Sequence, residues 1–137
     1  PGLRYASLPD EELDGVPHDM VIASYGAGIG DSPGDTYTLY VNKTSGLVDA
    51  IRYTVTFGRP QRQADAQRPK RETLFYYEDY VEVDGLKVAT RFRGFQFVDG
   101  QIGEFKNEAW ASEISFRQPF DATQLTMPAD GRIQPLP

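Results

Sequence analysis

The chain has 137 residues and a net charge of −6, with no cysteine and one histidine, His18. A length of this order predicts one domain, residues 1–137, since domains usually hold roughly 100–200 residues. The composition excludes disulfides, Cys-ligated zinc, a Cys nucleophile and a multi-histidine metal site within the chain. Nucleic acid is not an expected partner, because phosphate binding needs a basic face. No run approaches the roughly 20 apolar residues of a membrane-spanning helix, so no transmembrane segment is expected.

The first 35 residues carry the acidic excess, with seven acids against a single basic residue, Arg4. We predict short strands at 3–6 and 20–23, and a helical turn at 9–13, because acidic side chains favour the first turn of a helix. His18 lies in an acidic stretch and is expected at the surface. The start at Pro1, without Met or an apolar leader, predicts the C-terminal part of a longer precursor.

A glycine-rich segment follows at 26–35. The spacing Gly26-x-Gly28-x-Gly30 is part of the dinucleotide-binding fingerprint, but Asp31 occupies the third glycine position and the next residues do not open a helix. The Asp-x-Asp-x-Asp-Gly pattern of a calcium loop is also absent. We therefore predict a flexible loop with no cofactor and no metal.

From residue 36 onward the pattern is one strand after another. We predict strands at 37–41 and 47–57, joined by a turn at 42–46. Alternation in the second strand indicates one packed face and one solvated face. The packed side is predicted to hold Leu47, Ile51, Tyr53, Val55 and Phe57, and the solvated side Arg52, Thr54 and Thr56. Residues 58–72 are rich in Pro, Gln and Arg, and we predict a long flexible loop there.

The pair Asp84-Gly85 gives the strongest local signal. Asp-Gly between alternating runs favours a two-residue hairpin turn, because both positions need positive φ. The resulting hairpin joins 73–83 to 86–97. Its predicted cross-strand pairs are Val83–Leu86, Val81–Val88, Tyr77–Phe92, Glu82–Lys87 and Glu78–Arg91. Beyond Val83–Leu86, which the turn itself sets, two apolar and two opposite-charge pairs thus follow, each worth roughly 0.2–1 kcal/mol.

A second hairpin is predicted at Asp99-Gly100, leading into a strand at 104–117. A two-residue loop places Arg91 opposite Glu108. A loop one residue longer, with a bulge, places Trp110 on the same face as Phe92, and we favour it because it protects the only tryptophan. Residues 119–125 predict a capped helical turn.

The expected fold class is mostly β: a curved antiparallel meander sheet of about seven strands with little helix. One apolar sheet face needs a cover, and no long amphipathic helix is available to supply it. We therefore expect this face to be incompletely covered and to bind a hydrophobic ligand. The predicted ligand-binding residues are Tyr53, Phe57, Phe75, Tyr77, Phe92 and Trp110. The alternative is a structural or interaction domain with a filled core, as a module or a homodimer.

Catalysis is not expected. No Gly-x-Ser-x-Gly elbow is present for a Ser-His-Asp arrangement. Among the glutamates, Glu78 and Glu82 have predicted basic partners, and such pairing lowers a carboxyl pKa where a general acid needs it raised. We therefore predict no catalytic residue and no cofactor.

Three segments together resemble a known family: 37–55, with its Lys-Thr-Ser-Gly-Leu turn; 77–86, with Tyr-Val-Glu-Val-Asp-Gly; and the closing 120–128. They resemble the bacterial periplasmic lipoprotein-carrier (LolA/LolB-like) superfamily, and most of all its outer-membrane-lipoprotein-like branch. The resemblance implies an unclosed half-barrel whose concave apolar face receives acyl chains or a lipidated partner. It also implies a periplasmic or outer-membrane-associated location and no enzymatic activity. The carriers cover the concave face with helices, which this chain lacks at adequate length.

Overall fold

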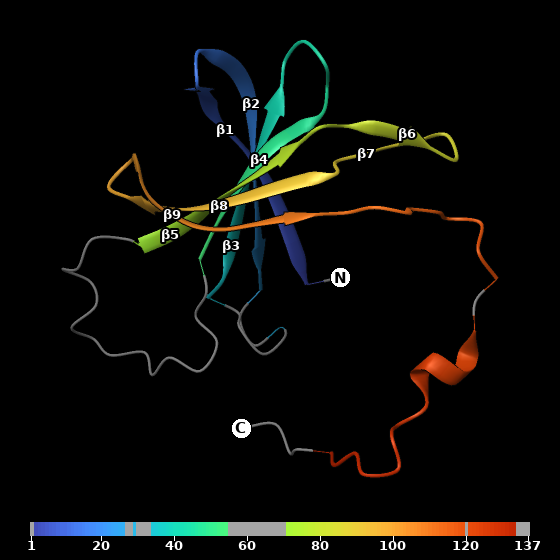
Figure 1. Cartoon of the computed structure of the whole chain (residues 1–137). Helices are drawn as coiled ribbons and strands as arrows, with labels where there is room; N and C mark the ends of the chain where they lie inside the picture. The colour runs from blue at the N-terminus through green and yellow to red at the C-terminus, as the bar shows by residue number, and fades with distance from the viewer. Residues whose placement is uncertain (1, 27–28, 30–33, 55–70, 120, 134–137) are drawn as a thin grey trace.

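The computed structural model describes residues 2–26, 29, 34–54, 71–119 and 121–133. These residues form one open antiparallel sheet of seven strands and a separate two-stranded ribbon (Figure 1). The sheet contains, in order, β1 (Leu3–Leu13), β2 (Val16–Tyr25), β3 (Thr36–Asn42), β4 (Val48–Tyr53), β5 (Arg71–Glu78), β8 (Arg91–Val98) and β9 (Gln101–Trp110). The ribbon pairs β6 (Val81–Val83) with β7 (Leu86–Val88).

The sheet is a meander in which every strand lies beside its predecessor, except that β8 follows β5 after the ribbon. The first and last strands, β1 and β9, do not pair, so the sheet stays open. In Figure 1 the strands β1–β4 cross β5, β8 and β9 at a steep angle, as a strong right-handed twist requires. The predicted mostly β fold, an unclosed antiparallel meander with little helix, is confirmed.

Three Asp-Gly pairs make the tight hairpin turns. Asp14-Gly15, Asp84-Gly85 and Asp99-Gly100 have φ angles of 51° and 78°, 53° and 85°, and 51° and 79°. Positive φ at both positions is the condition for the turn that matches strand twist. The second and third turns were predicted, and the first was not. The predicted helical turn at 9–13 is wrong, because pairing across Asp14-Gly15 draws these residues into β1.

The hairpin around Asp84-Gly85 has the predicted register. The observed partners are Val83–Leu86, Glu82–Lys87, Val81–Val88, Glu78–Arg91 and Tyr77–Phe92. The hairpin is interrupted once, at Asp79, whose φ of 53° separates β5 from β6. The bend sends the ribbon away from the main sheet while the register continues through it (Figure 1).

The register of β8 and β9 differs from the favoured prediction. The turn is a two-residue loop with Val98 opposite Gln101, and two irregularities follow, at Gly94/Phe95 and Phe95/Phe97. A single bulge reverses which face a side chain occupies, but two restore it. Trp110 is therefore opposite Arg91, off the face of Phe92, and is 69% exposed. The strand also ends at Trp110, well short of the predicted residue 117.

The core lies on the face of the sheet that was predicted to be solvated. In β4, Ala50 is fully buried, while Ile51 and Tyr53 on the other face are half-buried. The core side chains are Leu13, Met20, Tyr40, Ala50, Leu74, Tyr76 and Phe97, with Leu8 and Phe95 packed beside them. The predicted packed face was wrong because alternation separates two faces without saying which is buried, and Arg52 made this one look polar.

The sheet covers this core with its own first hairpin. The Tyr76 hydroxyl on β5 donates a 2.9 Å hydrogen bond to Asp14 at the β1–β2 turn. The Tyr40 hydroxyl donates to Glu11 of β1 at 3.0 Å. The Arg52 guanidinium lies 5.0 Å from the centroid of the Phe97 ring, on β8. The sheet thus closes one face against itself.

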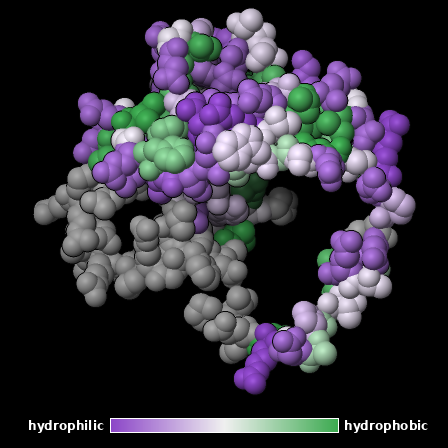
Figure 2. Space-filling view, viewed as in Figure 1, coloured by the Kyte–Doolittle hydropathy of each residue, from purple (hydrophilic) through white to green (hydrophobic). Residues whose placement is uncertain are grey.

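Beyond β9 the chain leaves the sheet. A short 3-10 helix, η2 (Ala122–Leu125), is capped by Asp121, as predicted for 119–125. The Phe116 amide donates to Asp84 at 2.9 Å, and Leu125 and Ile133 are 78% and 86% exposed. Figure 2 shows this segment standing away from the body. None of the described helices has the length and apolar character to cross a bilayer.

Two predicted loops fall largely outside the described residues. Most of the loop predicted at 58–72 lies there, although 71 and 72 already belong to β5. Most of the glycine-rich loop at 26–35 lies there too.

Two truncations compare the faces of the sheet. Leu74→Ala, at a fully buried position, should lower the free energy of unfolding by about 2–5 kcal/mol through lost burial and the cavity left behind. Phe92→Ala, on the half-buried face, should cost about 1–2 kcal/mol although it removes more atoms. Urea unfolding of both variants measures the order. A larger loss for Phe92→Ala would place the core on the other face.

Candidate functional site

The face of the sheet opposite the core carries a continuous set of aromatic rings. We call it the aromatic face: Tyr25, Tyr37, Tyr53, Phe75, Tyr77 and Phe92 from β2, β3, β4, β5 and β8. Register explains the grouping, because Tyr37 is paired with Tyr53 and Tyr77 with Phe92. All six side chains are half-buried. Aliphatic Val21, Leu39 and Ile51 lie on the same face and are also half-buried.

The rings touch in two groups. Tyr37 is stacked on Tyr53 with centroids 6.0 Å apart. Phe75 is stacked on Phe92 at 6.1 Å, and Tyr77 meets Phe92 edge to face at 5.4 Å. The paired positions Ile51 and Phe75 join the groups across β4 and β5. Aromatic pairs of this geometry add about 0.5–1.5 kcal/mol of stabilisation beyond that of their buried area. The ring contacts therefore fix the positions of these side chains on the face.

Gly94 lies close to side chains of the two neighbouring strands, Phe75 and Asn107. It is paired with Phe75 across β5 and β8. A Cβ at Gly94 would come within 3.3 Å of the Phe75 ring and 2.2 Å of the Asn107 side-chain oxygen. This glycine is required by close approach rather than by backbone conformation.

Four of the six residues predicted to bind a ligand lie on this face: Tyr53, Phe75, Tyr77 and Phe92. Trp110 lies on the Arg91 side of β9 and does not join them. Phe57 lies outside the described residues. The prediction missed Tyr37 and Leu39. They alternate along 37–41 as Ile51 and Tyr53 do on the next strand, so aligning the two strands as a hairpin would have placed all four on one face.

No described element covers the aromatic face. The one described helix, η2, has four residues and none of them is buried. Half-buried aromatic and aliphatic side chains from five adjacent strands therefore form an open apolar surface. On monomeric proteins, apolar patches beyond a few hundred Å² are unusual and mark interaction or ligand sites.

One cationic group reaches the edge of this face. The Lys106 ammonium donates a 2.8 Å hydrogen bond to the Thr73 hydroxyl, and Thr73 shares its face with Tyr53 and Phe75. Burial raises the pKa values of Tyr37 and Tyr77, so their hydroxyls stay protonated at neutral pH. The face thus offers aromatic surface, neutral hydroxyl donors and one positive charge at its border.

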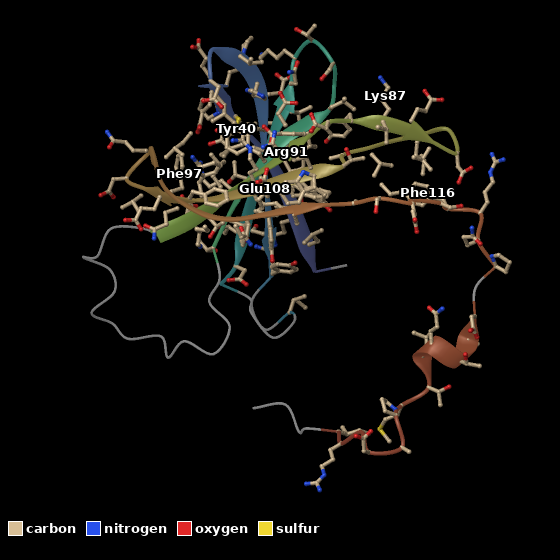
Figure 3. All side chains as sticks on the ribbon, in the orientation of Figure 1. Tyr40, Lys87, Arg91, Phe97, Glu108 and Phe116 are labelled. Atoms are coloured by element: carbon tan, nitrogen blue, oxygen red, sulfur yellow. The ribbon has the colours of Figure 1, made fainter. Side chains whose placement is uncertain are left out.

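The core side of β8 carries ion pairs instead. Arg93 donates two hydrogen bonds to Glu78, at 2.6 and 2.5 Å, and Arg91 donates one to Glu108 at 2.7 Å. Figure 3 labels Arg91 and Glu108 beside one another. The hydrogen bond from Arg93 holds the pKa of Glu78 below its usual range. Glu78 is therefore a charge partner, unsuited to act as a general acid at neutral pH.

His18 is buried, contrary to the prediction that it lies at the surface. It is 1% exposed, and its Nε2 lies 3.0 Å from Asp49. Asn42 donates to the same carboxylate oxygen at 2.7 Å. The cause is the pairing of β2 with β3, which sets His18 opposite Asn42. Within the described part of the chain, no group of three or more His, Asp or Glu side chains is placed to hold a metal ion.

Comparisons with protein-family models, curated proteins and solved structures gave no match to this chain.

The Glu78–Arg93 pair predicts a pH dependence of stability. A carboxyl pKa that is lower in the folded than in the unfolded state, where it is about 4.3, stabilises the fold at pH values above the unfolded pKa. That stabilisation, about 1 kcal/mol for a charge-assisted pair that is partly exposed, is lost as the pH falls through the lower, folded pKa. Glu78→Gln should therefore be less stable than wild type at pH 7, and the difference should be smaller at pH 3, which lies below the unfolded pKa.

Urea unfolding at both pH values measures this effect. The exposed Glu12→Gln on β1 is the matched control, and it should show no comparable change. A difference for Glu78→Gln that persists unaltered at pH 3 would contradict the ion-pair interpretation.

Proposed function

We propose that this protein is a non-catalytic binder of a hydrophobic ligand, a lipid or acyl chain, on the aromatic face of its sheet. The observation that carries the proposal is the joined set of half-buried rings with no cover from the described residues. Ligand sites for apolar molecules are lined by aromatic and aliphatic side chains with a few placed polar groups. The aromatic face has this composition, with Lys106 and the hydroxyls of Tyr37 and Tyr53 as its polar groups.

The position of Lys106 favours an amphiphile with an anionic head. Its ammonium is held at Thr73, next to the apolar surface rather than on it. A carboxylate or phosphate at that position gains a charge-assisted hydrogen bond, while the chain lies over Phe75, Tyr53 and Ile51. We therefore propose a fatty acid, or an acyl chain bearing an acidic headgroup, as the ligand class.

The resemblance to the lipoprotein-carrier superfamily supports the same class of ligand. It extends the proposal to a bacterial cell-envelope protein, periplasmic or associated with the outer membrane, that receives an acyl chain or a lipidated partner. In one respect the proposal differs from a carrier with a concave cavity: the ligand would lie on the face opposite the core residues Tyr40, Leu74 and Phe97.

A fatty acid with a fluorescent dansyl group tests the proposal by titration into the full chain. We expect saturable binding that weakens at least tenfold in Ile51→Asp, because a carboxylate on the aromatic face opposes an apolar chain. Phe105→Asp is the matched control: it places the same group at an apolar side chain that is 57% exposed and packs beside Phe95, outside the aromatic face. It should bind as wild type does.

Lys106→Gln distinguishes the contribution of the ligand's headgroup to binding from that of its acyl chain. The variant should lose affinity for the dansyl fatty acid but not for its methyl ester. Analytical ultracentrifugation of the ligand-free protein tests the alternative, a homodimer formed through the same face. If the wild type is a dimer, Ile51→Asp is a monomer and the probe does not bind, the face serves self-association and not ligand binding. Equal binding to wild type and Ile51→Asp would contradict the proposal.

A further inference from the structure

The open sheet has two edge strands, β1 and β9, which differ in how well they are protected against pairing with another strand. An edge strand presents backbone N–H and C=O groups to which a further strand can bind, and bulges, prolines and charged side chains discourage this. The pairing of β9 with β8 has two irregularities, and β9 carries the charged residues Glu104, Lys106 and Glu108. This edge is therefore a poor template for a further strand.

The other edge, β1, is protected over only half of its length. A break in register interrupts its second half, which also contains Pro9 and three successive acids at 10–12. Residues 3–8 pair with β2 without interruption and include no proline and one charged side chain, Arg4. Residues 3–7 are all exposed, and none of the described strands pairs with the outer side of β1. This half of the strand is thus an unprotected edge.

The direction of the backbone groups on this edge follows from one hydrogen bond. The Gly26 amide donates to the Gly2 carbonyl at 2.8 Å, so the backbone polar groups of Gly2 point toward β2. Residues of an antiparallel strand alternate in the side to which these groups point. The N–H and C=O groups of Leu3, Tyr5 and Ser7 therefore point outward, away from β2.

We propose that two copies of this chain pair antiparallel along residues 3–7 of β1, with Tyr5 at the two-fold axis. This register sets Leu3 opposite Ser7 of the second copy, so all outward groups exchange hydrogen bonds. A shift by one residue sets outward-pointing residues opposite inward-pointing ones. A shift by two sets Leu3 opposite Pro9, which has no N–H, or sets Ser7 before the start of the strand at Leu3.

The side chains of this edge favour the same register. Leu3 and Tyr5 are 40% and 68% exposed. They lie on the side of the sheet that carries the aromatic face, because Leu3 is opposite Tyr25, and Tyr5 is opposite Ala23, which is opposite Tyr37. Pairing about Tyr5 brings the two Tyr5 rings together and continues the aromatic face from one copy into the other. The dimer itself does not need a ligand, and it forms or fails separately from the proposed function.

The charges also permit two acidic chains to meet here. The acids at 10–12 lie five or more residues from Tyr5, which is roughly 17 Å along a strand. Antiparallel pairing places these acids at opposite ends of the dimer interface. Their separation exceeds the screening length of about 8 Å at physiological ionic strength, so they oppose the pairing only weakly.

Analytical ultracentrifugation of the full chain over a series of concentrations tests the proposal, and we expect a reversible monomer–dimer equilibrium. Ser7→Pro removes an outward N–H but none that bonds to β2, and it should raise the dissociation constant of the dimer at least tenfold. Ser7→Ala keeps that N–H and should dimerise as wild type does. Circular dichroism checks that each variant is folded.

Tyr5→Lys is a second variant, which keeps the test decisive if Ser7→Pro does not fold. It sets two ammonium groups directly opposite one another, which is destabilising between strands, and should also raise the dissociation constant at least tenfold. Ser112→Lys, the same charge change at an exposed position outside β1, should dimerise as wild type does.

Cysteine cross-linking tests the register, because the chain has no cysteine of its own. Hydrogen-bonded residue pairs of antiparallel strands have Cα atoms about 5.5 Å apart, within the range of a disulfide. Tyr5→Cys should therefore give a covalent dimer under mild oxidation, whereas Leu3→Cys, which is four residues out of register with its copy, should not. Ile51→Asp should remain a dimer, since it alters the aromatic face and not the edge.

Three results would overturn the proposal: a wild-type chain that is monomeric at every concentration, dispersal of the dimer by Ile51→Asp but not by Tyr5→Lys, or equal cross-linking of Leu3→Cys and Tyr5→Cys.

Discussion

A seven-stranded sheet with almost no helix has to cover one of its own faces. If an apolar face stays in water, the fold loses the hydrophobic free energy that offsets the conformational entropy lost on folding. The chain meets this constraint by twisting until its first hairpin crosses β5 and β8, which brings Leu13 and Met20 onto Leu74, Tyr76 and Phe97. The separate turns, registers and ion pairs all depend on that crossing, because only there do distant strands share a core.

The acidic N-terminal residues belong to this crossing. Glu11 and Asp14 accept hydrogen bonds from the hydroxyls of Tyr40 and Tyr76, two buried tyrosines. Burial raises the pKa of both tyrosines, and the hydrogen bonds to carboxylates raise it further. Protonated tyrosines therefore donate to ionised acids at neutral pH. Part of the acidic excess of residues 1–35 therefore has a structural role. These carboxylates accept hydrogen bonds where the two halves of the sheet meet.

The face of the sheet that holds the core also carries arginines, whose side chains pack on its aromatic rings. Arg52 lies over the rings of Tyr40 and Phe97, and Arg93 over those of Tyr76 and Phe95, all at 5.0–5.7 Å. Their stems pack on aromatic carbon while their heads reach carboxylates, as long basic side chains commonly do. Arg52, for example, reaches Glu72 and Glu11 at 3.5 Å. An arginine in an alternating strand is thus weak evidence for the solvated side.

This explains how far the sequence predicted the structure. The Asp84-Gly85 hairpin and its five cross-strand pairs were predictable because a two-residue turn fixes register locally. Four members of the aromatic face were predictable by the same alternation. The buried face, the location of Trp110 and the burial of His18 were not. They depend on two bulges in β8–β9 and on pairing between β2, β3 and β4, which no short window of sequence contains.

The aromatic face follows from the same constraint on covering the sheet. A twisted single sheet can close only one face against itself, so the other face stays open, and here it carries stacked rings. An open apolar surface on one face is thus a consequence of how one sheet buries its core without helices.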